Sequence, residues 1–449
     1  MQKVLLARGM RDFLPDAMRR RRRVIETVRE VFERFGFEPL ETPALERLET
    51  LEGKYGEEGD RLIYRVLKRG EGGEEGESDL GLRYDLTVPL ARVVAMNPDL
   101  PLPLRRWQIQ PVWRADRPQR GRFREFLQCD VDVVGSPSPV ADAECLAVVD
   151  AALTALGLGA FEVRLNHRGI LRALAEAAGA GDRETDVLVA LDKLDKVGRG
   201  GVEAELAARG LPPEAAGRLW SVLDRAGPPG ALPALEGLSA VNAGLPETGR
   251  TAVDTLRRVL AHAADLGVPA GRIRFDPTLA RGLDYYTGAV FETMVVAPHV
   301  GSISGGGRYD RLVGVFLGRD IPAVGVSLGL ERILAVLEET QGAGGERPAA
   351  RVLVAALDEA CLPAALRAAA FLRAAGEAVV IAPDPLPMRK VLRQADQRRV
   401  PFAAVVGPDE AAAGTTFLRR LADGAQWILP AADLLAHLGE DAPEPGPPG

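Results

Sequence analysis

Polar and apolar positions alternate along two segments between residues 105 and 135, on either side of a basic loop. In the second segment the apolar and polar sets interleave: Leu127, Cys129, Val131 and Val133 alternate with Gln128, Asp130 and Asp132. In the first, the polar positions with the same spacing are Arg106, Gln108, Gln110 and Arg114. A period of two places each set on one face of a strand. We therefore predict a hairpin with a polar floor.

The loop between these strands is rich in arginine: it carries Arg114, Arg117, Arg120, Arg122 and Arg124. A floor of carboxylates and amides beside a rim of arginines suits a substrate with a cationic end and a phosphate end. The alternative is an exposed hairpin whose polar face is merely solvated, and the hairpin alone leaves that alternative open.

A helical pattern precedes the hairpin, from residue 16 to residue 35. Its apolar residues recur on one stripe: Val24, Val28, Val31, Phe32 and Phe35. The arginine run 19–23 lies at the helix start, where it opposes the helix dipole. We expect a solvated face there; a contact with a nucleic acid is the less favoured interpretation. A short extended segment follows at Phe37 to Pro43.

Residues 82–95 change from a strand pattern to a helix pattern, and Asp85 and Thr87 lie at the junction. Both side chains could face a ligand at the helix N-terminus, or Thr87 could simply cap the helix. A helix is predicted at 139–156 and a strand at 161–166. Between 168 and 263 the pattern is mostly helical, which indicates an inserted helical segment.

Strand patterns return at 272–276, 289–296 and 323–327, and the last leads into a helix at 330–339 with Arg332 in its first turn. We predict a glycine-dense loop at Gly301 to Tyr309. It is neither a P-loop nor a dinucleotide-binding fingerprint, because neither glycine spacing occurs in the chain.

A linker is predicted at Gln341 to Pro348, and the pattern changes after it. Strands at 352–356, 378–381 and 403–406 alternate with helices at 362–375 and 388–399. Such alternation predicts a small α/β domain with a mainly parallel sheet. The proline-rich residues 439–449 are predicted to be disordered.

Composition narrows the class of protein. The chain has 449 residues, 47% of them hydrophobic, and a formal net charge of −7, so it is a multidomain globular protein without the charge of a general polyanion binder. It shows no leader segment and no membrane-spanning run, so we expect it in the cytoplasm. The 3 cysteines and 4 histidines are scattered, which argues against a zinc site and a Ser-His-Asp triad.

The candidate groups lack a nucleophile–base pair. The cations are Arg114, Arg122, Arg281 and Arg332, and the acids are Asp85, Asp130 and Asp132. Tyr285, Tyr286 and Gln128 supply hydrogen bonds, and Phe126 offers a stacking face. Such a set would act by positioning and charge stabilisation, as phosphoryl and nucleotidyl transfers require.

Five motifs carry a family resemblance: Phe37 to Pro43, Val112 to Gly135, Ala323 to Arg332 (AVGVSLGLER), Arg281 to Gly288 (RGLDYYTG) and Ser304 to Asp310 (SGGGRYD). The first three resemble motifs 1, 2 and 3 of class II aminoacyl-tRNA synthetases, and the last two resemble signatures of the histidyl-tRNA synthetases. The resemblance extends from Arg8 to about Leu438. It implies an α+β catalytic domain with an antiparallel sheet, a helical insertion and a C-terminal α/β anticodon-binding domain.

The implied domain boundaries follow the motifs. The catalytic domain would occupy 1–166 and 266–340, the helical insertion 167–265, the anticodon-binding domain 349–438, and a disordered tail 439–449.

The resemblance also implies roles for single residues. The histidine site would comprise Asp85, Leu86, Thr87, Arg114, Gln128, Asp132, Arg281, Tyr285, Tyr286 and Tyr309. ATP would be bound by Arg114, Arg122, Phe126 and Arg332, and the catalytic residues would be Arg114, Arg281 and Arg332. Arg117 and Gln119 match positions that contact the acceptor end of histidine tRNA. Asp130 receives no role from the family.

The implied activity is ATP-dependent ligation of L-histidine to tRNA(His) through a histidyl-adenylate, with release of AMP and pyrophosphate. A homodimer is implied, and Mg²⁺ with ATP, without an all-protein metal site. The main alternative is the histidine-sensing regulatory subunit of ATP phosphoribosyltransferase. That paralogue usually lacks the anticodon-binding domain and some catalytic arginines, which are present here. A tRNA-sensing module of the stress-kinase type is less favoured, because no kinase motif accompanies it.

Overall fold

The computed structural model describes residues 4–68, 78–119, 121–227, 233–280, 285–298, 300–342 and 348–439. The chain divides into two compact units, Met1–Gly344 and Gly345–Gly449. Arg120 and Arg281, both singled out from the sequence, lie outside the described residues, as do most of the predicted linker and tail.

The described part of the first unit is built on an eight-stranded sheet with the order β1-β5-β6-β11-β10-β9-β7-β8. In that order, the strands are Glu38–Pro39, Leu104–Trp113, Glu125–Val134, Ala323–Gly329, Ser302–Arg308, Ala289–Val295, Phe161–His167 and Ile273–Phe275. The six central strands are antiparallel, as predicted. The two edge strands, β1 and β8, pair in parallel, so the whole sheet is mixed.

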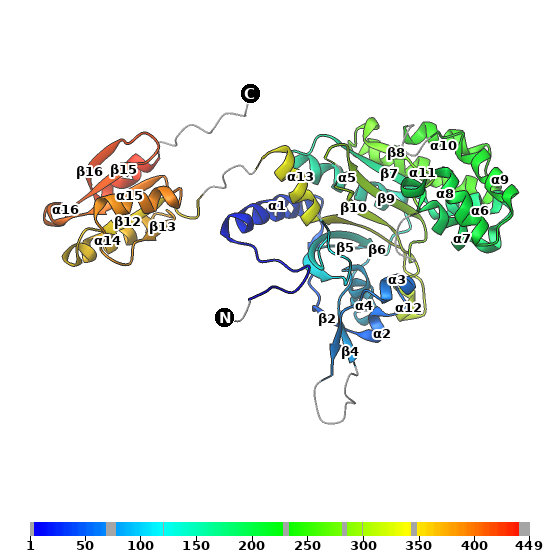
Figure 1. Ribbon diagram of the computed structural model, residues 1–449, viewed down its shortest axis with the longest axis horizontal. Coiled ribbons are helices and arrows are strands. Elements are labelled where there is room, and N and C mark those ends of the chain that lie inside the picture. Colours follow the sequence, from blue (N-terminus) through cyan, green and yellow to red (C-terminus); the bar gives the residue numbers. More distant parts are fainter. Residues whose placement is uncertain are drawn as a thin grey trace. The chain divides into compact units, whose positions relative to one another are not determined.

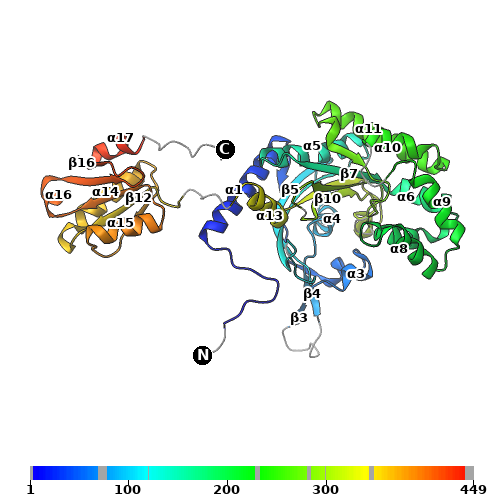
Figure 2. The same cartoon turned by 45° about the horizontal axis from the view of Figure 1, so that its top comes forward.

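Three helices cover one face of this sheet: α1 (Pro15–Arg34), α5 (Pro139–Ala155) and α13 (Leu330–Thr340) (Figures 1 and 2). They bury the apolar side of β6, where Cys129, Val131 and Val133 are at most 1% exposed. Fully burying one such valine contributes about 1.5–3 kcal/mol. The apolar set of the predicted alternation is therefore the core side of the hairpin.

The expectation of a solvated arginine run at the start of α1 is wrong for Arg21. This residue lies on the same helical stripe as Val24 and Val28, and it is only 4% exposed. It is buried because its guanidinium pairs with Glu331 of α13 at 2.7 Å. Arg22 and Arg23 are exposed, as expected.

The other face of the sheet carries smaller elements around the N-terminus of α4 (Thr87–Met96) (Figure 1). They are α2 (Leu48–Leu51), α3 (Gly56–Asp60), α12 (Gly314–Leu317) and a small sheet of β2 (Leu45–Arg47), β4 (Ser78–Leu82) and β3 (Arg65–Leu67). They leave the polar side of β6 facing a cavity.

The helical prediction for 168–263 is confirmed. The helices are α6 (Arg168–Ala177), α7 (Glu184–Leu191), α8 (Leu194–Ala208), α9 (Pro213–Leu223), α10 (Ala234–Asn242) and α11 (Glu247–Asp265). They gather beyond β7 and β8 at one end of the sheet (Figures 1 and 2). Helix α11 packs on α5, and both share one hydrophobic core with β7, so these helices are joined firmly to the sheet.

The predicted loop at 301–309 is instead β10, a strand in the middle of the sheet. Its glycines allow unusually close neighbours. A Cβ on Gly306 would lie 2.2 Å from the carbonyl oxygen of Gly325, and one on Gly307 would lie 2.6 Å from that of Ala289. Glycine in a strand marks such close backbone approaches, although the composition alone is more typical of a loop.

The second unit contains a five-stranded sheet with the order β13-β12-β14-β15-β16. The strands are Val379–Ile381, Val352–Ala356, Phe402–Val406, Thr415–Arg420 and Gln426–Pro430, and the helices are α14 (Leu362–Ala374), α15 (Met388–Gln397), α16 (Pro408–Ala413) and α17 (Leu434–Leu438). The first three strands are parallel, as predicted. The sequence prediction missed β15 and β16, which extend the sheet antiparallel.

Candidate active site

A cavity of about 480 Å³ lies on the polar face of the large sheet. It brings together most of the predicted site residues: Asp85, Thr87, Arg114, Arg122, Phe126, Gln128, Asp132, Tyr285, Tyr286, Tyr309 and Arg332. Leu86 does not line it, because its side chain is fully buried. Asp130, which the family resemblance leaves without a role, does line it.

The cavity floor follows from strand register. Across β5, β6 and β11 the paired positions form three rows: Arg106–Asp132–Gly325, Gln108–Asp130–Ser327 and Gln110–Gln128–Gly329. All of these side chains share one face because every row lies two residues from the next. The predicted polar face therefore exists, and it is buried rather than solvated: Gln108, Gln128, Asp130 and Asp132 are at most 7% exposed.

Asp132 is held between a cation and a phenol. Arg106 lies 2.7 Å from its carboxylate, and the Tyr309 hydroxyl donates a hydrogen bond to it. Gly325 makes room for this carboxylate, because a Cβ there would lie 1.9 Å from Asp132 Oδ1. Burial raises the pKa of Asp132, and Arg106 opposes that rise.

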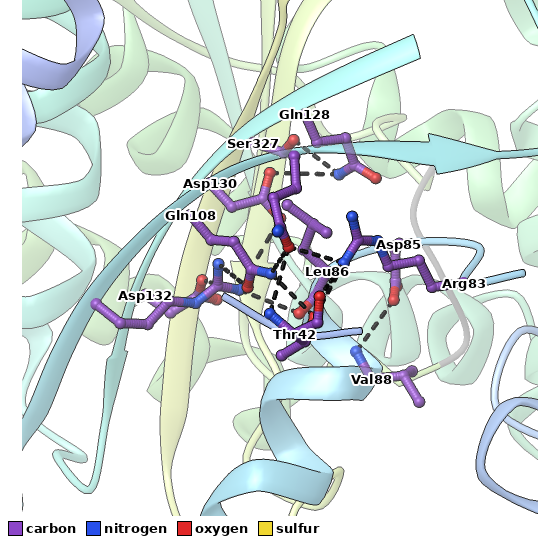
Figure 3. Close-up of polar contacts among 12 residues, drawn as sticks. Thr42, Arg83, Asp85, Leu86, Val88, Gln108, Gln128, Asp130, Asp132 and Ser327 are labelled. Atoms are coloured by element: carbon purple, nitrogen blue, oxygen red, sulfur yellow. Dashed lines mark hydrogen bonds and ion pairs between the residues drawn. The ribbon is translucent and has the colours of Figure 1, made fainter. Parts of the chain in front are cut away.

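Asp85 joins three donors at the start of α4. Its Oδ1 accepts from the backbone N–H of Val88 (3.0 Å) and from Tyr55 Oη (3.1 Å), and its Oδ2 accepts from Tyr285 Oη (3.1 Å). Asp85, not Thr87, is thus the side chain that caps α4 (Figure 3). Burial raises the pKa of Asp85, and these hydrogen bonds oppose the rise together with Arg114.

Three tyrosines form one wall of the cavity. The ring centroids of Tyr285 and Tyr286 are 5.0 Å apart, those of Tyr285 and Tyr309 are 5.9 Å apart, and both pairs meet edge to face. This edge-to-face packing gives a wall that is partly aromatic and partly polar, suited to a planar ring that can exchange hydrogen bonds.

Part of the cavity lining, which we call the arginine end, is cationic. Arg114 Nε donates to the carbonyl of Tyr84 at 3.0 Å, which sets the guanidinium 4.2 Å from the centre of the Tyr84 ring and 5.2 Å from that of Phe126. Arg122 pairs with Asp116 at 2.9 Å, and Arg332 donates to the carbonyl of Ser302. Three guanidinium groups thus line one end of the cavity, where phosphate oxygens could bind.

The N-terminal segment holds the basic loop, a role that the sequence did not reveal. The backbone N–H of Arg124 donates to the carbonyl of Gly9 at 3.0 Å, and the Arg11 guanidinium lies 3.3 Å from the centre of the Phe123 ring. Gly9 has φ +84, and a Cβ there would lie 2.8 Å from Cγ of Arg124. A glycine is therefore required at this contact.

Arg308 supports the site from behind the sheet. It is 8% exposed, donates to Asp142 of α5 and also bonds the carbonyl of Ser136 at 3.0 Å. These contacts fix the end of β10 against the loop that follows β6, and they orient the adjacent Tyr309. Its place within SGGGRYD was the only sequence signal for Arg308, and no role was predicted for it.

The two predicted tRNA contacts, Arg117 and Gln119, are exposed and lie outside the cavity. Gln119 and Arg122 exchange backbone hydrogen bonds of 3.0 and 2.9 Å, which close the described part of the loop. Within the described ranges, no group of three or more His, Cys, Asp or Glu residues could hold a metal ion. None of the described helices is both long and apolar enough to cross a bilayer.

Two family models match the chain. One, for histidyl-tRNA synthetase, covers residues 9–333, and the other, for an anticodon-binding domain, covers residues 351–441. The chain belongs to the histidyl-tRNA synthetase family.

Individual relatives agree with this family assignment. A histidine–tRNA ligase of Cytophaga hutchinsonii is 42% identical over 445 residues, which is 95% of this chain and 97% of that protein. One of Aeropyrum pernix is 44% identical over 427 residues, covering 94% and 95%. The crystal structure of a Nostoc histidyl-tRNA synthetase has a TM-score of 0.81 at 32% identity, and the match covers 98% of this chain and 99% of that one.

Proposed function

We propose that this member of the histidyl-tRNA synthetase family charges tRNA(His) with L-histidine. In the first step the histidine carboxylate attacks the α-phosphorus of ATP, giving histidyl-adenylate and pyrophosphate. In the second step the terminal ribose of the tRNA takes the histidyl group and AMP leaves. The observation that carries the proposal is one cavity that joins an acid–tyrosine end to an arginine end.

The acid–tyrosine end would bind histidine. Asp85, Thr87, Gln128 and Asp132 would surround its α-amino group, and Tyr285, Tyr286 and Tyr309 would contact the imidazole. Buried acceptors and phenols left unpaired by a wrong amino acid would cost binding energy, which explains how such a pocket could select histidine.

The arginine end would bind ATP. Arg114 would contact both the histidine carboxylate and the α-phosphate, Arg122 and Arg332 would hold the other phosphates, and Phe126 would stack on adenine. The family resemblance adds Arg281 at the α-phosphate. These guanidinium groups would stabilise the charge that develops at phosphorus, which explains why no nucleophile–base pair is needed.

Mg²⁺ would arrive with ATP. A magnesium ion on a nucleotide is held chiefly by phosphate oxygens and water, with one or two carboxylates. Asp116 and Glu292 are carboxylates of the cavity wall that could complete such a shell. When bound, the ion would neutralise charge on the phosphates.

The tRNA contacts would come from two places. Arg117 and Gln119 would meet the acceptor end, and the C-terminal unit, which matches the anticodon-binding family, would meet the anticodon. Separate contacts to an end and a loop are usual for RNA recognition. Homodimerisation is proposed on the resemblance of Phe37 to Pro43 to motif 1.

The test is ATP–pyrophosphate exchange measured against each amino acid in turn. We expect exchange with histidine alone. Histidine binding without exchange would instead support the regulatory-subunit alternative, for which the ligase relatives and the anticodon-binding domain provide less support. The change Arg281→Ala should slow exchange far more than it weakens histidine binding.

A further inference from the structure

The amide of Gln128 lies in a fixed orientation on the cavity floor. Its Nε2 donates to Ser327 Oγ at 2.8 Å and to Asp130 Oδ1 at 3.3 Å (Figure 3). Its Oε1 is buried and has no hydrogen-bond partner among the described residues, although Gln128 lines the cavity. Both amide hydrogens are therefore used on the floor, and an acceptor is left for a ligand.

The two partners of Nε2 differ in how far they restrict the orientation of the Gln128 amide. An ionised carboxylate only accepts hydrogen bonds, whereas a serine hydroxyl both donates and accepts. Ser327 would be satisfied by either end of the Gln128 amide. Asp130 would not, because Oε1 in place of Nε2 would set two acceptors against each other. The orientation of the amide thus depends on Asp130.

We propose that Asp130 is a positioning residue of the histidine site, which turns the Gln128 carbonyl toward the α-ammonium group of histidine. The inference rests on the proposed function, and it adds a residue to which the family resemblance gives no role. A Gln128 amide turned the other way would present Nε2–H to the ammonium group and repel it.

The surroundings of Asp130 make the orientation of the Gln128 amide sensitive to pH. Arg106 of β5 lies 4.0 Å from Asp130 but 2.7 Å from Asp132, so its charge chiefly serves Asp132. Arg83 is a second cation that interacts with Asp130, and the remaining groups that face it are neutral or acidic: Gln108, Gln128, Ser327, Asp85 and Tyr286. Burial raises the pKa of Asp130 to about 7, with Arg106 opposing the rise and Asp132 adding to it. Below that pH a protonated Asp130 can donate, and the amide is free to turn.

The decisive variant is Asp130→Asn, which keeps the shape but supplies an amide that can donate to Gln128 Oε1. We expect the KM for histidine in the exchange reaction to rise about tenfold, as loss of a hydrogen bond to a charged group would do, with the KM for ATP within about twofold. An unchanged KM for histidine in an enzyme that exchanges normally would overturn the proposal.

Two control variants separate orientation from general damage. Ser327→Ala removes the other contact of Nε2 and a hydrogen bond to Asp130, but it keeps the Asp130 carboxylate, so we expect a rise in the histidine KM of less than about threefold. Asp116→Asn makes the same chemical change at the arginine end, where it removes the partner of Arg122. It should alter the KM for ATP and not that for histidine. Equal losses in Ser327→Ala and Asp130→Asn would overturn the proposal.

An analogue of histidine provides a second measurement, in which general damage to the fold of the variant can be distinguished from loss of the ammonium contact. Imidazolepropionate lacks the α-amino group, so its inhibition constant should be the same in the wild type and in Asp130→Asn. If the variant weakens this analogue as much as it weakens histidine, Asp130 does not act through the ammonium contact. Absence of histidine-dependent exchange in the wild type would refute the proposed function itself, which is a distinguishable outcome.

The pH profile completes the test. Histidine titrates identically with both enzymes, so the ratio of their histidine KM values isolates Asp130. This ratio should be largest above pH 7 and should fall toward one as the pH drops, because protonation removes the carboxylate of the wild type. A ratio independent of pH would contradict the role given to ionised Asp130.

Discussion

Arg21 of α1 and Glu331 of α13 form an ion pair of 2.7 Å in which each side chain is only 4% exposed. Glu331 also accepts from the backbone N–H of Leu127 in β6, at 3.1 Å. The pair therefore ties two helices of the covering layer to the hairpin whose other face is the cavity floor. It also lies next to Arg332, so the same helical turn serves both stability and the arginine end of the site.

Removal of Arg21 should destabilise the first unit strongly. Arg21→Ala leaves Glu331 buried without its close partner, a change that typically costs about 3–5 kcal/mol. The neighbouring Arg22→Ala is the matched control, because Arg22 is exposed and surface changes stay within about 0.5 kcal/mol. Thermal unfolding of both variants checks this. Equal melting temperatures would mean that the pair contributes nothing.

A methyl group at Gly325 should destroy the amino-acid end of the cavity. Its Cβ would lie 1.9 Å from Asp132 Oδ1 and 2.8 Å from the carbonyl oxygen of Val131, so Asp132 must leave its place. We expect Gly325→Ala to raise the histidine KM by at least about tenfold, the loss expected when a charged hydrogen bond is disrupted. Gly329→Ala, on the same strand, is the control.

The nearest atom to a Cβ at Gly329 is the carbonyl oxygen of Ile303, at 3.5 Å, which is an ordinary contact. Histidine binding should survive this change. Titration calorimetry with histidine compares the two variants without requiring turnover, and similar losses in both would contradict the steric argument.

Two tyrosines donate to the same carboxylate, and comparing them distinguishes a residue that contacts the ligand from one that only supports the site. Tyr285 and Tyr55 each donate to Asp85 at 3.1 Å, but Tyr285 lines the cavity and Tyr55 does not. We expect Tyr285→Phe to raise the histidine KM about tenfold and Tyr55→Phe by no more than about threefold. Steady-state exchange kinetics measure both. A larger effect from Tyr55→Phe would place the ligand elsewhere.

His167 should make stability fall in mild acid. Burial lowers its pKa to about 4, and Arg308 adds to the effect. The unfolded chain protonates this imidazole near pH 6.5, so between about pH 6.5 and 4 the unfolded state binds more protons and stability falls as the pH is lowered. Above pH 6.5 the contribution is constant.

The variant His167→Asn removes this titration and keeps a cap. His167 Nδ1 accepts from the backbone N–H of Gly169 at 2.9 Å at the start of α6, and asparagine caps helices well. Urea midpoints at pH 8 should be similar, and the variant should lose less stability on going to pH 5. Parallel pH profiles would show that His167 is not the responsible group.

Gln119 should act in the second step of the reaction only. It is exposed and lies outside the cavity, in the loop proposed to meet the acceptor end of tRNA. Gln119→Ala should slow transfer of histidine to tRNA by about tenfold, as loss of one specific nucleic-acid contact would do, and leave exchange intact. Arg122→Ala is the comparison, because it should impair exchange. A fall in exchange with Gln119→Ala would mean that the loop serves ATP instead.

Local periodicity was sufficient for the central hairpin. The alternation of polar and apolar residues at 127–133 predicted both the strand and the face that meets the core. Successive side chains of a strand point to opposite faces, so the spacing alone separates the two faces. The apolar stripe of α1 and the helices between 168 and 263 were also predicted from local periodicity. Local patterns failed where a tertiary contact overrode composition: β10 looked like a loop because its glycines meet strands distant in sequence, and Arg21 looked solvated because Glu331 lies 310 residues further along the chain.

The sequence by itself therefore determined the family, most of the order of elements apart from strands such as β10, β15 and β16, and the kinds of side chain that the site contains, since these depend on residue identity and spacing. Only the tertiary structure decided the partners. In the structure Asp85 accepts hydrogen bonds from two tyrosines and caps α4, Asp132 pairs with Arg106, and the Gln128 amide donates to Asp130. Such pairings arise from the register of strands far apart in the chain, and no local pattern encodes that register. This is also why Asp130, which a motif could not distinguish from its neighbours, acquires a role in three dimensions.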